Sequence, residues 1–280
     1  MLKLFRAPVF AILIMMLIFP EQGMAYRCVF RHKGTYHLTA NTALLWNPVS
    51  RQRFFDLGAD REVFPASTTK VLTALMVLEN LPLDRYVTVS QHATQVPQSK
   101  MDLRTGESYR VRDLLYGLIL KSANDAAVTL AVSVSGSEAK FVELMNNRAR
   151  QLGANDTHFA NSHGLPADHG QCTSAYDMFL MFREALKQPF FHDAIEEREK
   201  VIESLACRKI PLRSHNKALF KNWKARVWGK TGYTLAAHAC FIGHVLKGKE
   251  DLIIGVFGCA GSTRWDDIKY IIEKYGGVDL

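Results

Sequence analysis

Apolar and polar residues recur along the chain with two different periods, and each period predicts a different kind of element. In the middle of the chain apolar residues recur every three or four positions, the spacing of a helix buried along one face. Four helices are predicted in this way, at residues 111–120, 125–134, 138–152 and 173–186. Another helix is expected to begin near Ser67 and to end by Leu81-Pro82, because the residue before a proline avoids helical conformation.

Strand patterns lie towards the two ends of the chain. A hairpin is expected first, and three longer strands followed by a helix over residues 263–274 are expected last. The strand segments are residues 42–46, 52–55, 226–231, 237–246 and 251–259. The last strand is nearly all apolar, which is typical of a strand buried on both faces. We therefore expect a mixed α/β (α+β) fold.

The expected organisation is one domain of two lobes. An α/β lobe would be built from both ends of the chain, about residues 26–82 and 205–280. An all-helical lobe would be inserted between them, at about residues 83–204. A crevice between two lobes is a usual place for a binding site.

The first residues predict export. Lys3 and Arg6 precede an apolar run over residues 9–19, and Gly23 and Ala25 supply small residues where a signal peptidase cuts. We expect a signal peptide at residues 1–25 and a protein that resides in the periplasm or cell envelope. The apolar run is short for a membrane span, although an uncleaved segment that serves as a membrane anchor is the alternative.

Net charge and cysteine content restrict the class of partner only partly. The formal charge is +8, and loss of the two cations and one anion of the predicted signal leaves +7. This charge suits an anionic cell envelope, whereas export and the lack of Lys/Arg runs argue against nucleic acid. Five cysteines remain after cleavage, and an odd number leaves at least one without a partner in the same chain. Cys240 and Cys259 fall on neighbouring strands, but the sequence does not define any pairing.

Ser67 and Lys70 form the first candidate catalytic pair. Residues three apart on a helix lie one above the other, so the Lys70 amine can reach the Ser67 hydroxyl. A serine with an adjacent base is a candidate nucleophile. The same spacing occurs at Ser137–Lys140 and Ser214–Lys217. The first of these is interpreted as a helix cap, and the second leaves no room for a helix before the strand that follows.

Two further motifs follow in order, and together the three motifs indicate a family. Ser122-Ala123-Asn124 comes directly after a predicted helix, and Lys230-Thr231-Gly232 lies on a predicted strand. With these motifs and the loop His163-Gly164-Leu165, the chain resembles the penicillin-recognising serine D,D-peptidases, in particular the low-molecular-weight D-alanyl-D-alanine carboxypeptidase and endopeptidase family. The resemblance covers nearly the whole mature chain. It implies a β-lactamase/D,D-peptidase-like fold, with an antiparallel sheet flanked by helices.

The resemblance also implies a role for the motif residues. Ser67 would attack the carbonyl of the penultimate D-alanine and form an acyl-enzyme, with Lys70 as the general base. Ser122 would relay a proton to the departing amine, and Asn124 would hold the substrate's peptide group. Lys230 and Thr231 would bind the terminal carboxylate of the substrate or of a penicillin.

The backbone around Gly232 is implied to bind the substrate as well. Without a side chain at Gly232, the substrate could lie along the strand edge, and the N–H groups of Ser67 and Tyr233 would bind the oxyanion. Tyr233 is larger than the residue expected there, so it either narrows the cleft entrance or packs over the strand edge. The implied partners are peptidoglycan stem peptides, with β-lactams as covalent inhibitors. No cofactor or metal is implied.

Four alternative functions stay open. A D,D-endopeptidase that cleaves cross-links uses the same motifs, and the short chain after the last helix favours a soluble or signal-anchored member of the family. A class A β-lactamase needs an added glutamate, for which Glu143 is the candidate, although it lies inside a predicted helix. A zinc peptidase would use His163, Asp168 and His169, without HExxH spacing. The fourth alternative is an inactive scaffold of the cell envelope.

Overall fold

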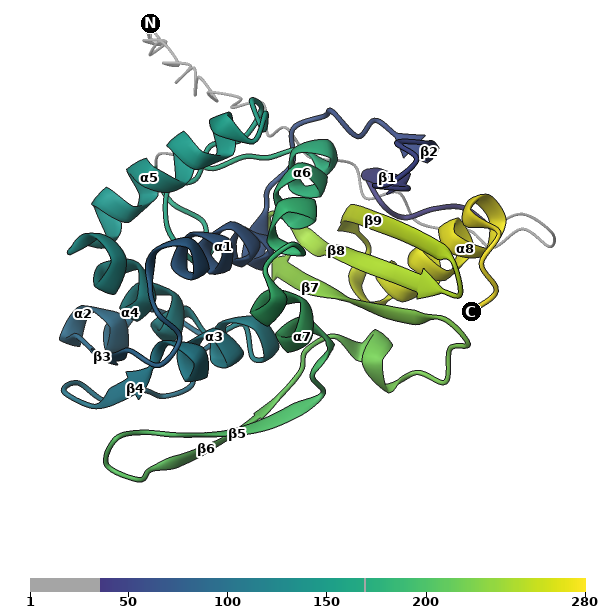
Figure 1. Cartoon of the computed structure of the whole chain (residues 1–280). Coiled ribbons are helices and arrows are strands. Elements are labelled where there is room, and N and C mark those ends of the chain that lie inside the picture. The colour runs from purple at the N-terminus through teal and green to yellow at the C-terminus, as the bar shows by residue number, and fades with distance from the viewer. Residues whose placement is uncertain (1–35, 169) are drawn as a thin grey trace, which may run out of the picture. The chain divides into compact units, whose positions relative to one another are not determined.

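The computed structural model describes residues 36–168 and 170–280, so the predicted signal segment and Cys28 lie outside the described residues. Five strands form one antiparallel sheet in the order β2–β1–β9–β8–β7 (Figure 1). Their bounds are Thr42–Trp46 for β1, Arg53–Leu57 for β2, Arg226–Thr234 for β7, His238–Lys247 for β8 and Glu250–Cys259 for β9. The chain ends therefore meet in one sheet, and the antiparallel mixed α/β fold expected from the sequence is confirmed.

Apolar residues on both faces explain why the sheet is covered by helices on both sides. In β9, Ile253 and Phe257 belong to the core on the side of helix α6 (Ala175–Ala185), whereas Ile254 and Val256 belong to the core on the side of helix α8 (Arg264–Gly276). Side chains alternate between faces along a strand, so a continuous apolar run supplies two cores at once. The sequence-based prediction for this strand is confirmed.

The segment between β2 and β7 carries the remaining helices. These are α1 (Lys70–Asn80), α2 (Gln91–Gln95), α3 (Val111–Leu120), α4 (Asn124–Ser135), α5 (Glu138–Gln151), α6 and α7 (Pro189–Glu196), with the short 3₁₀ turns η1 (Ala66–Thr69) and η2 (Lys217–Phe220). A further 3₁₀ turn, η3 (Gly261–Thr263), lies between β9 and α8. Helix α3 has the predicted bounds, and α1 ends at the predicted place because Leu81, before the proline, is extended. Ser137 caps α5 by accepting a hydrogen bond from the Lys140 N–H, as predicted.

This segment is more mixed than the predicted all-helical lobe. It also contains β3 (Tyr86–Thr88) paired with β4 (Ser108–Arg110), and β5 (Glu199–Glu203) paired with β6 (Lys209–Arg213) in a hairpin that projects from the body (Figure 1). Strands of three residues are too short to show a period. In the hairpin Pro211 argues against a strand, and Val201 is exposed, so the pattern there was equally uninformative.

The cysteines of the described residues are all free. Cys172 and Cys207 lie apart from the sheet, and Cys240 and Cys259 lie on neighbouring strands, as expected. Cys240, however, belongs to the core on the α6 side and Cys259 to the core on the α8 side. The two buried thiols therefore point to opposite faces of the sheet. Among the described residues no helix is long and apolar enough to cross a membrane.

Candidate active site

Ser67 and Lys70 meet at the junction between a 3₁₀ turn and helix α1. The sequence predicts an α-helix that begins near Ser67, but Ser67 lies in the 3₁₀ turn η1, and α1 begins only at Lys70. Side chains three residues apart lie directly above one another in a 3₁₀ turn, so this geometry also brings the side chains of Ser67 and Lys70 together, as predicted. Lys70 Nζ donates to Ser67 Oγ over 3.0 Å. Ser67 is half-buried and Lys70 is fully buried, so only the candidate nucleophile is open to solvent.

Lys70 Nζ is surrounded by acceptors that come from three different parts of the chain. Besides Ser67 Oγ, it donates to Asn124 Oδ1 over 2.7 Å and to the backbone carbonyl of His163 over 2.6 Å. Burial lowers the pKa of Lys70 well below its usual value, the nearby charge of Lys230 lowers it further, and Asp125 partly opposes both. A lysine with such a lowered pKa gives up its proton more easily than an exposed one and can act as a base, held in one geometry by its hydrogen bonds.

Ser122 and Asn124 lie where helix α3 ends and α4 begins. Ser122 has a φ of 58°, a left-handed conformation that costs a non-glycine residue energy, and its side chain is buried. Asn124 is fixed at both ends of its amide, since Oδ1 accepts from Lys70 and Nδ2 donates to the Pro97 carbonyl over 2.9 Å. The predicted second motif is therefore in direct contact with the first, through the hydrogen bond between Asn124 and Lys70.

Lys230 reaches the same place from β7, the edge strand of the sheet. Its Nζ donates to Ser122 Oγ over 2.8 Å and to the Thr231 carbonyl over 3.0 Å. Burial, followed by the positive charge of Arg264, lowers the pKa of Lys230 to about 7. Thr231 is partly exposed next to it. The third motif thus joins the second through a direct hydrogen bond.

Gly232 allows β7 to approach the 3₁₀ turn that carries Ser67. A Cβ at this position would lie 3.1 Å from Ala66 Cβ and 3.2 Å from the Ser67 backbone nitrogen. The backbone of β7 is therefore in contact with the backbone beside Ser67. Tyr233, the next residue, is 59% exposed.

Two residues that support the site were not singled out from the sequence. The Asp125 carboxylate accepts from the backbone N–H groups of Met101 and Leu103, which holds the loop beside Asn124 against α4. Arg264, at the start of α8, donates to the carbonyls of Gly232 (3.1 Å) and Cys240 (2.8 Å). The sequence points to Asp125 only through its place directly after the second motif. No sequence feature points to Arg264, because only the fold brings the start of α8 next to β7.

The loop that carries His163 closes one side of the site. Asn161 Oδ1 accepts from the backbone N–H groups of His163 and Gly164, which shapes the turn. Gly164 has a φ of +86°, and a Cβ there would lie 1.8 Å from the Ala66 carbonyl oxygen. Only glycine meets both conditions. The loop therefore packs directly on the turn that carries Ser67.

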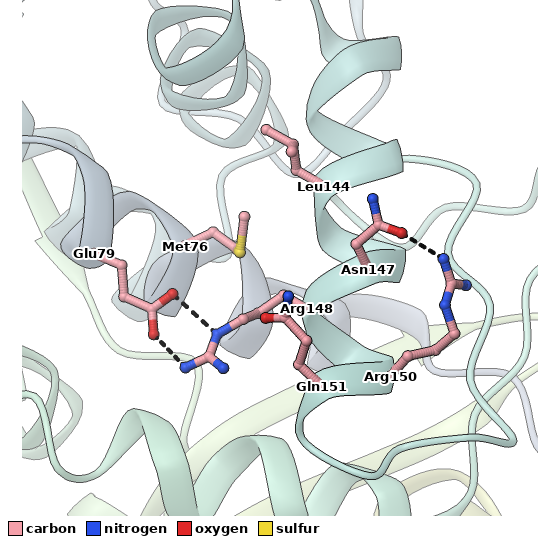
Figure 2. A pocket seen from close by; sticks show the side chains of 7 residues that line it. All are labelled: Met76, Glu79, Leu144, Asn147, Arg148, Arg150 and Gln151. Carbon is pink, nitrogen blue, oxygen red and sulfur yellow. Dashed lines mark hydrogen bonds and ion pairs between the residues drawn. The ribbon is translucent and has the colours of Figure 1, made fainter.

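A hollow of about 480 Å³ between α1 and α5 lies outside this constellation. Figure 2 shows that its charged groups point to partners of their own: Arg148 forms a paired hydrogen bond with Glu79, and Arg150 donates to Asn147. Met76 and Leu144 supply its apolar wall. The pair Arg148–Glu79 joins the two helices, whereas Arg150 and Asn147 both belong to α5, and the residues that line the hollow include no nucleophile.

The structure also places the residues of the alternative hypotheses. Glu143 is an exposed residue of α5, as the sequence predicted. Asn216 caps η2, so the Ser214–Lys217 segment forms a short turn. His163 contributes its backbone carbonyl to Lys70, and His169 lies outside the described residues. Within the ranges 36–168 and 170–280, no three His, Cys, Asp or Glu residues are grouped as metal ligands would be.

Known proteins resemble this chain over most of its length. The profile of the peptidase S11 family, described as D-alanyl-D-alanine carboxypeptidase, matches residues 30–261. The chain belongs to this family. It is 32% identical to the D-alanyl-D-alanine carboxypeptidase DacF of Bacillus subtilis over 88% of this chain and 64% of DacF. It is 35% identical to DacB2 of Mycobacterium tuberculosis, a protein with the same description, over 77% of this chain and 76% of DacB2.

Solved structures show the same fold. A D-alanyl-D-alanine carboxypeptidase from Mycobacterium tuberculosis superimposes with a TM-score of 0.80 and 29% identity, covering 90% of this chain and 99% of that one. The predicted membership in the D,D-peptidase family is confirmed. The chain spans less than two thirds of the length of DacF, so the activity of such relatives as whole proteins is only proposed for this chain.

Proposed function

We propose that this S11 family member is a serine-type D-alanyl-D-alanine carboxypeptidase that trims peptidoglycan stem peptides through an acyl-enzyme on Ser67. The observation that carries the proposal is the position of Lys70, a buried amine of lowered pKa, 3.0 Å from the hydroxyl of a half-buried serine. A serine hydroxyl becomes a nucleophile when a neighbouring base accepts its proton. Lys70 fits that description without any other group.

In this mechanism the acylation step moves one proton on each side of the scissile bond. Ser67 Oγ bonds to the carbonyl carbon of the penultimate D-alanine while its proton passes to Lys70. The bond to the terminal D-alanine breaks, and its amine takes a proton from Ser122. The proton that Lys70 took from Ser67 would replace it, so that Lys70 is neutral again, while Lys230, which donates to Ser122 Oγ, keeps its charge. Water then adds to the acyl carbon and gives a proton to Lys70. That proton passes to Ser67 Oγ as the ester bond breaks, and the shortened peptide leaves as its carboxylic acid.

The remaining motif residues would bind the substrate. Lys230 and Thr231 would hold the terminal carboxylate, with the charge of Arg264 adding to the attraction from behind β7. Asn124 would orient Lys70 and contact the substrate's peptide group. The backbone N–H groups of Ser67 and Tyr233 would bind the oxyanion, an assignment supported by the close approach of Gly232 to the Ser67 nitrogen.

Penicillins would acylate the same serine, because their carboxylate and strained carbonyl occupy the places of the substrate's groups. Slow release of the penicilloyl group is expected, since Glu143 is an exposed residue of α5 and provides no deacylating base. We further propose that the protein acts in the cell envelope, in keeping with its signal-like first residues and basic charge.

A fluorescent penicillin tests the nucleophile. The wild type should be labelled covalently, and Ser67→Ala should not, whereas Ser214→Ala, in a segment that resembles the motif only by spacing, should be labelled like the wild type. Labelling of Ser67→Ala would overturn the mechanism, and absence of labelling in all three would support the scaffold alternative. Rapid hydrolysis of nitrocefin would instead favour the β-lactamase alternative. Loss of activity in EDTA would favour the zinc peptidase alternative.

Defined peptidoglycan fragments test the substrate. The protein should release D-alanine from pentapeptide monomers. Its second candidate function, cleavage of cross-links as an endopeptidase, is the result if cross-linked dimers are converted to monomers instead. The Ser67→Ala variant is the control in both reactions.

A further inference from the structure

A carboxylate on the outer side of the His163 loop holds the backbone that touches Lys70. Glu138 is the first residue of α5, and its side chain is only 15% exposed. Its Oε1 accepts two hydrogen bonds from Ser162, one from the backbone N–H over 3.0 Å and one from Oγ over 2.6 Å. A glutamate in the first turn of a helix is often solvated, so this pair of bonds to a distant loop requires an explanation.

The inner side of the same loop is held by helix α1. Thr73 Oγ1 donates to the Ser162 carbonyl over 2.7 Å, and Lys70 Nζ donates to the next carbonyl, that of His163, over 2.6 Å. Lys70 and Thr73 are three residues apart and therefore lie on one face of α1. Two successive carbonyls of the loop thus accept hydrogen bonds from two side chains on the same face of α1.

The loop has little freedom to take another position. Gly164 lies so close to the Ala66 carbonyl oxygen that a Cβ would come within 1.8 Å of it, so the loop cannot move further towards Ser67. Movement away from Ser67 would break the hydrogen bonds that Lys70 and Thr73 donate to the loop. On the outer side the two hydrogen bonds to Glu138 hold Ser162, so the His163 carbonyl is fixed by contacts on both sides of the loop.

The surroundings of Glu138 favour an ionised carboxylate. Burial raises the pKa of Glu138, but the hydrogen bonds from Ser162, the charge of His163 and the hydrogen bond from His92 together outweigh it, and the pKa lies below its usual value. His163 Nε2 lies 3.8 Å from Oε1, and His92 Nε2 lies 3.4 Å from Oε2. Burial and the charge of Lys70 lower the pKa of His163 to about 4, so its ring is neutral near neutral pH. A surface hollow of about 590 Å³ borders Glu138 on this outer side.

We propose that Glu138 is a positioning residue for acylation: by binding Ser162, it sets the place of the His163 carbonyl and, through it, the orientation of Lys70 towards Ser67. This inference rests on the proposed function. Glu138 acts through the backbone of the loop and does not touch the substrate.

The test compares rates of acylation by benzylpenicillin. Glu138→Ala removes the acceptor, so acylation should slow by about 10–100-fold, the size expected when a catalytic group is misplaced. The loss should appear in the rate constant for acylation, with non-covalent affinity nearly unchanged. Glu138→Gln keeps Oε1 and should stay within about threefold of the wild type. Glu143→Gln, an exposed glutamate of the same helix, is the matched control and should not change the rate.

The pH profile separates positioning from a merely structural role. A carbonyl that accepts from an ammonium favours the charged form, so loss of that contact lowers the pKa of Lys70. The acid limb of acylation in Glu138→Ala should therefore move to lower pH, by about half a unit or more. The titratable groups that face Lys70 are Lys230, Asp125, His163 and His215, and His163 and His92 face Glu138; none of them is altered in these variants.

Each other outcome contradicts the inference in a distinct way. Acylation of Glu138→Ala at the control rate, or an unmoved acid limb, would overturn it, and a loss in Glu138→Gln as large as in Glu138→Ala would show that charge acts instead of geometry. If Glu138→Ala fails to fold, Ser162→Ala, which removes only the shorter bond, should slow acylation by a smaller factor. A wild type that no penicillin labels would refute the proposed function itself, independently of Glu138.

Discussion

Lys230 and Ser122 are 108 residues apart in the chain, yet Lys230 Nζ donates to Ser122 Oγ over 2.8 Å. Together with the 3.0 Å bond between Lys70 and Ser67, this makes two lysine–serine pairs in one site. The two amines also interact, since the charge of Lys230 lowers the pKa of Lys70. The charge on Lys230 therefore favours loss of the proton from Lys70. One amine can then act as a base while the other binds an anion.

Acylation should therefore depend on pH with two limbs. On the acid side the rate should rise as Lys70, whose pKa lies well below its usual value, becomes neutral. On the basic side it should fall above about pH 7, where Lys230 loses the charge that we propose binds the carboxylate of the substrate or penicillin. The second-order rate constant for penicillin acylation, measured from pH 4 to pH 10, checks this. A rate that keeps rising to pH 10 would contradict the role of Lys230.

Lys230→Met should lower the rate of acylation and raise the free energy of unfolding. Removal of a buried ammonium should raise the free energy of unfolding at pH 7 by about 1–4 kcal/mol, while acylation falls strongly. Unfolded Lys230 regains its usual pKa of 10.5, so the unfolded chain binds more protons between pH 7 and 10.5, and the wild type gains stability as the pH rises through that window. The advantage of the variant should therefore shrink towards pH 10 in thermal melts. Lys249→Met, at an exposed turn, should show neither effect.

Gly164→Ala should be far more damaging than the same change at Gly106. Both glycines have a left-handed φ, +86° and +85°, so both variants carry the same backbone strain of about 1–2 kcal/mol. At Gly106 a Cβ would meet nothing within 4 Å, whereas at Gly164 it would collide with the Ala66 carbonyl oxygen. Urea denaturation should give a loss of about 3 kcal/mol or more for Gly164→Ala. Equal losses would mean that the loop does not need its close contact with Ala66.

Tyr233→Ser should leave the chemistry intact. The ring is 59% exposed, so its loss should change the free energy of unfolding by no more than about 0.5 kcal/mol. Only the backbone N–H at this position is assigned to the oxyanion, and acylation by benzylpenicillin should stay within a few-fold of the wild type. Acylation by bulkier β-lactams should become faster if the ring narrows the entrance. A large loss with benzylpenicillin would show that the ring itself contacts the substrate.

Much of the fold could be predicted because its signals are local. Helix α3 and strand β1 have the predicted bounds, since an amphipathic period and a short apolar strand each express their own burial. The hairpin β5–β6 could not be predicted. Its Pro211 and its exposed Val201 obscure the pattern, and the pairing between the two strands decides its structure.

The candidate site divides in the same way. The sequence by itself determined the candidate pair Ser67 and Lys70, because a spacing of three residues brings the two side chains together, and the order of the later motifs distinguished this pair from two others with the same spacing. Only the tertiary structure decided what surrounds Lys70. Asn124, the His163 carbonyl, Arg264 and Glu138 come from separate elements, and no period in the chain records which of them will meet. The lowered pKa values arise from that burial and those neighbours, and these exist only after folding.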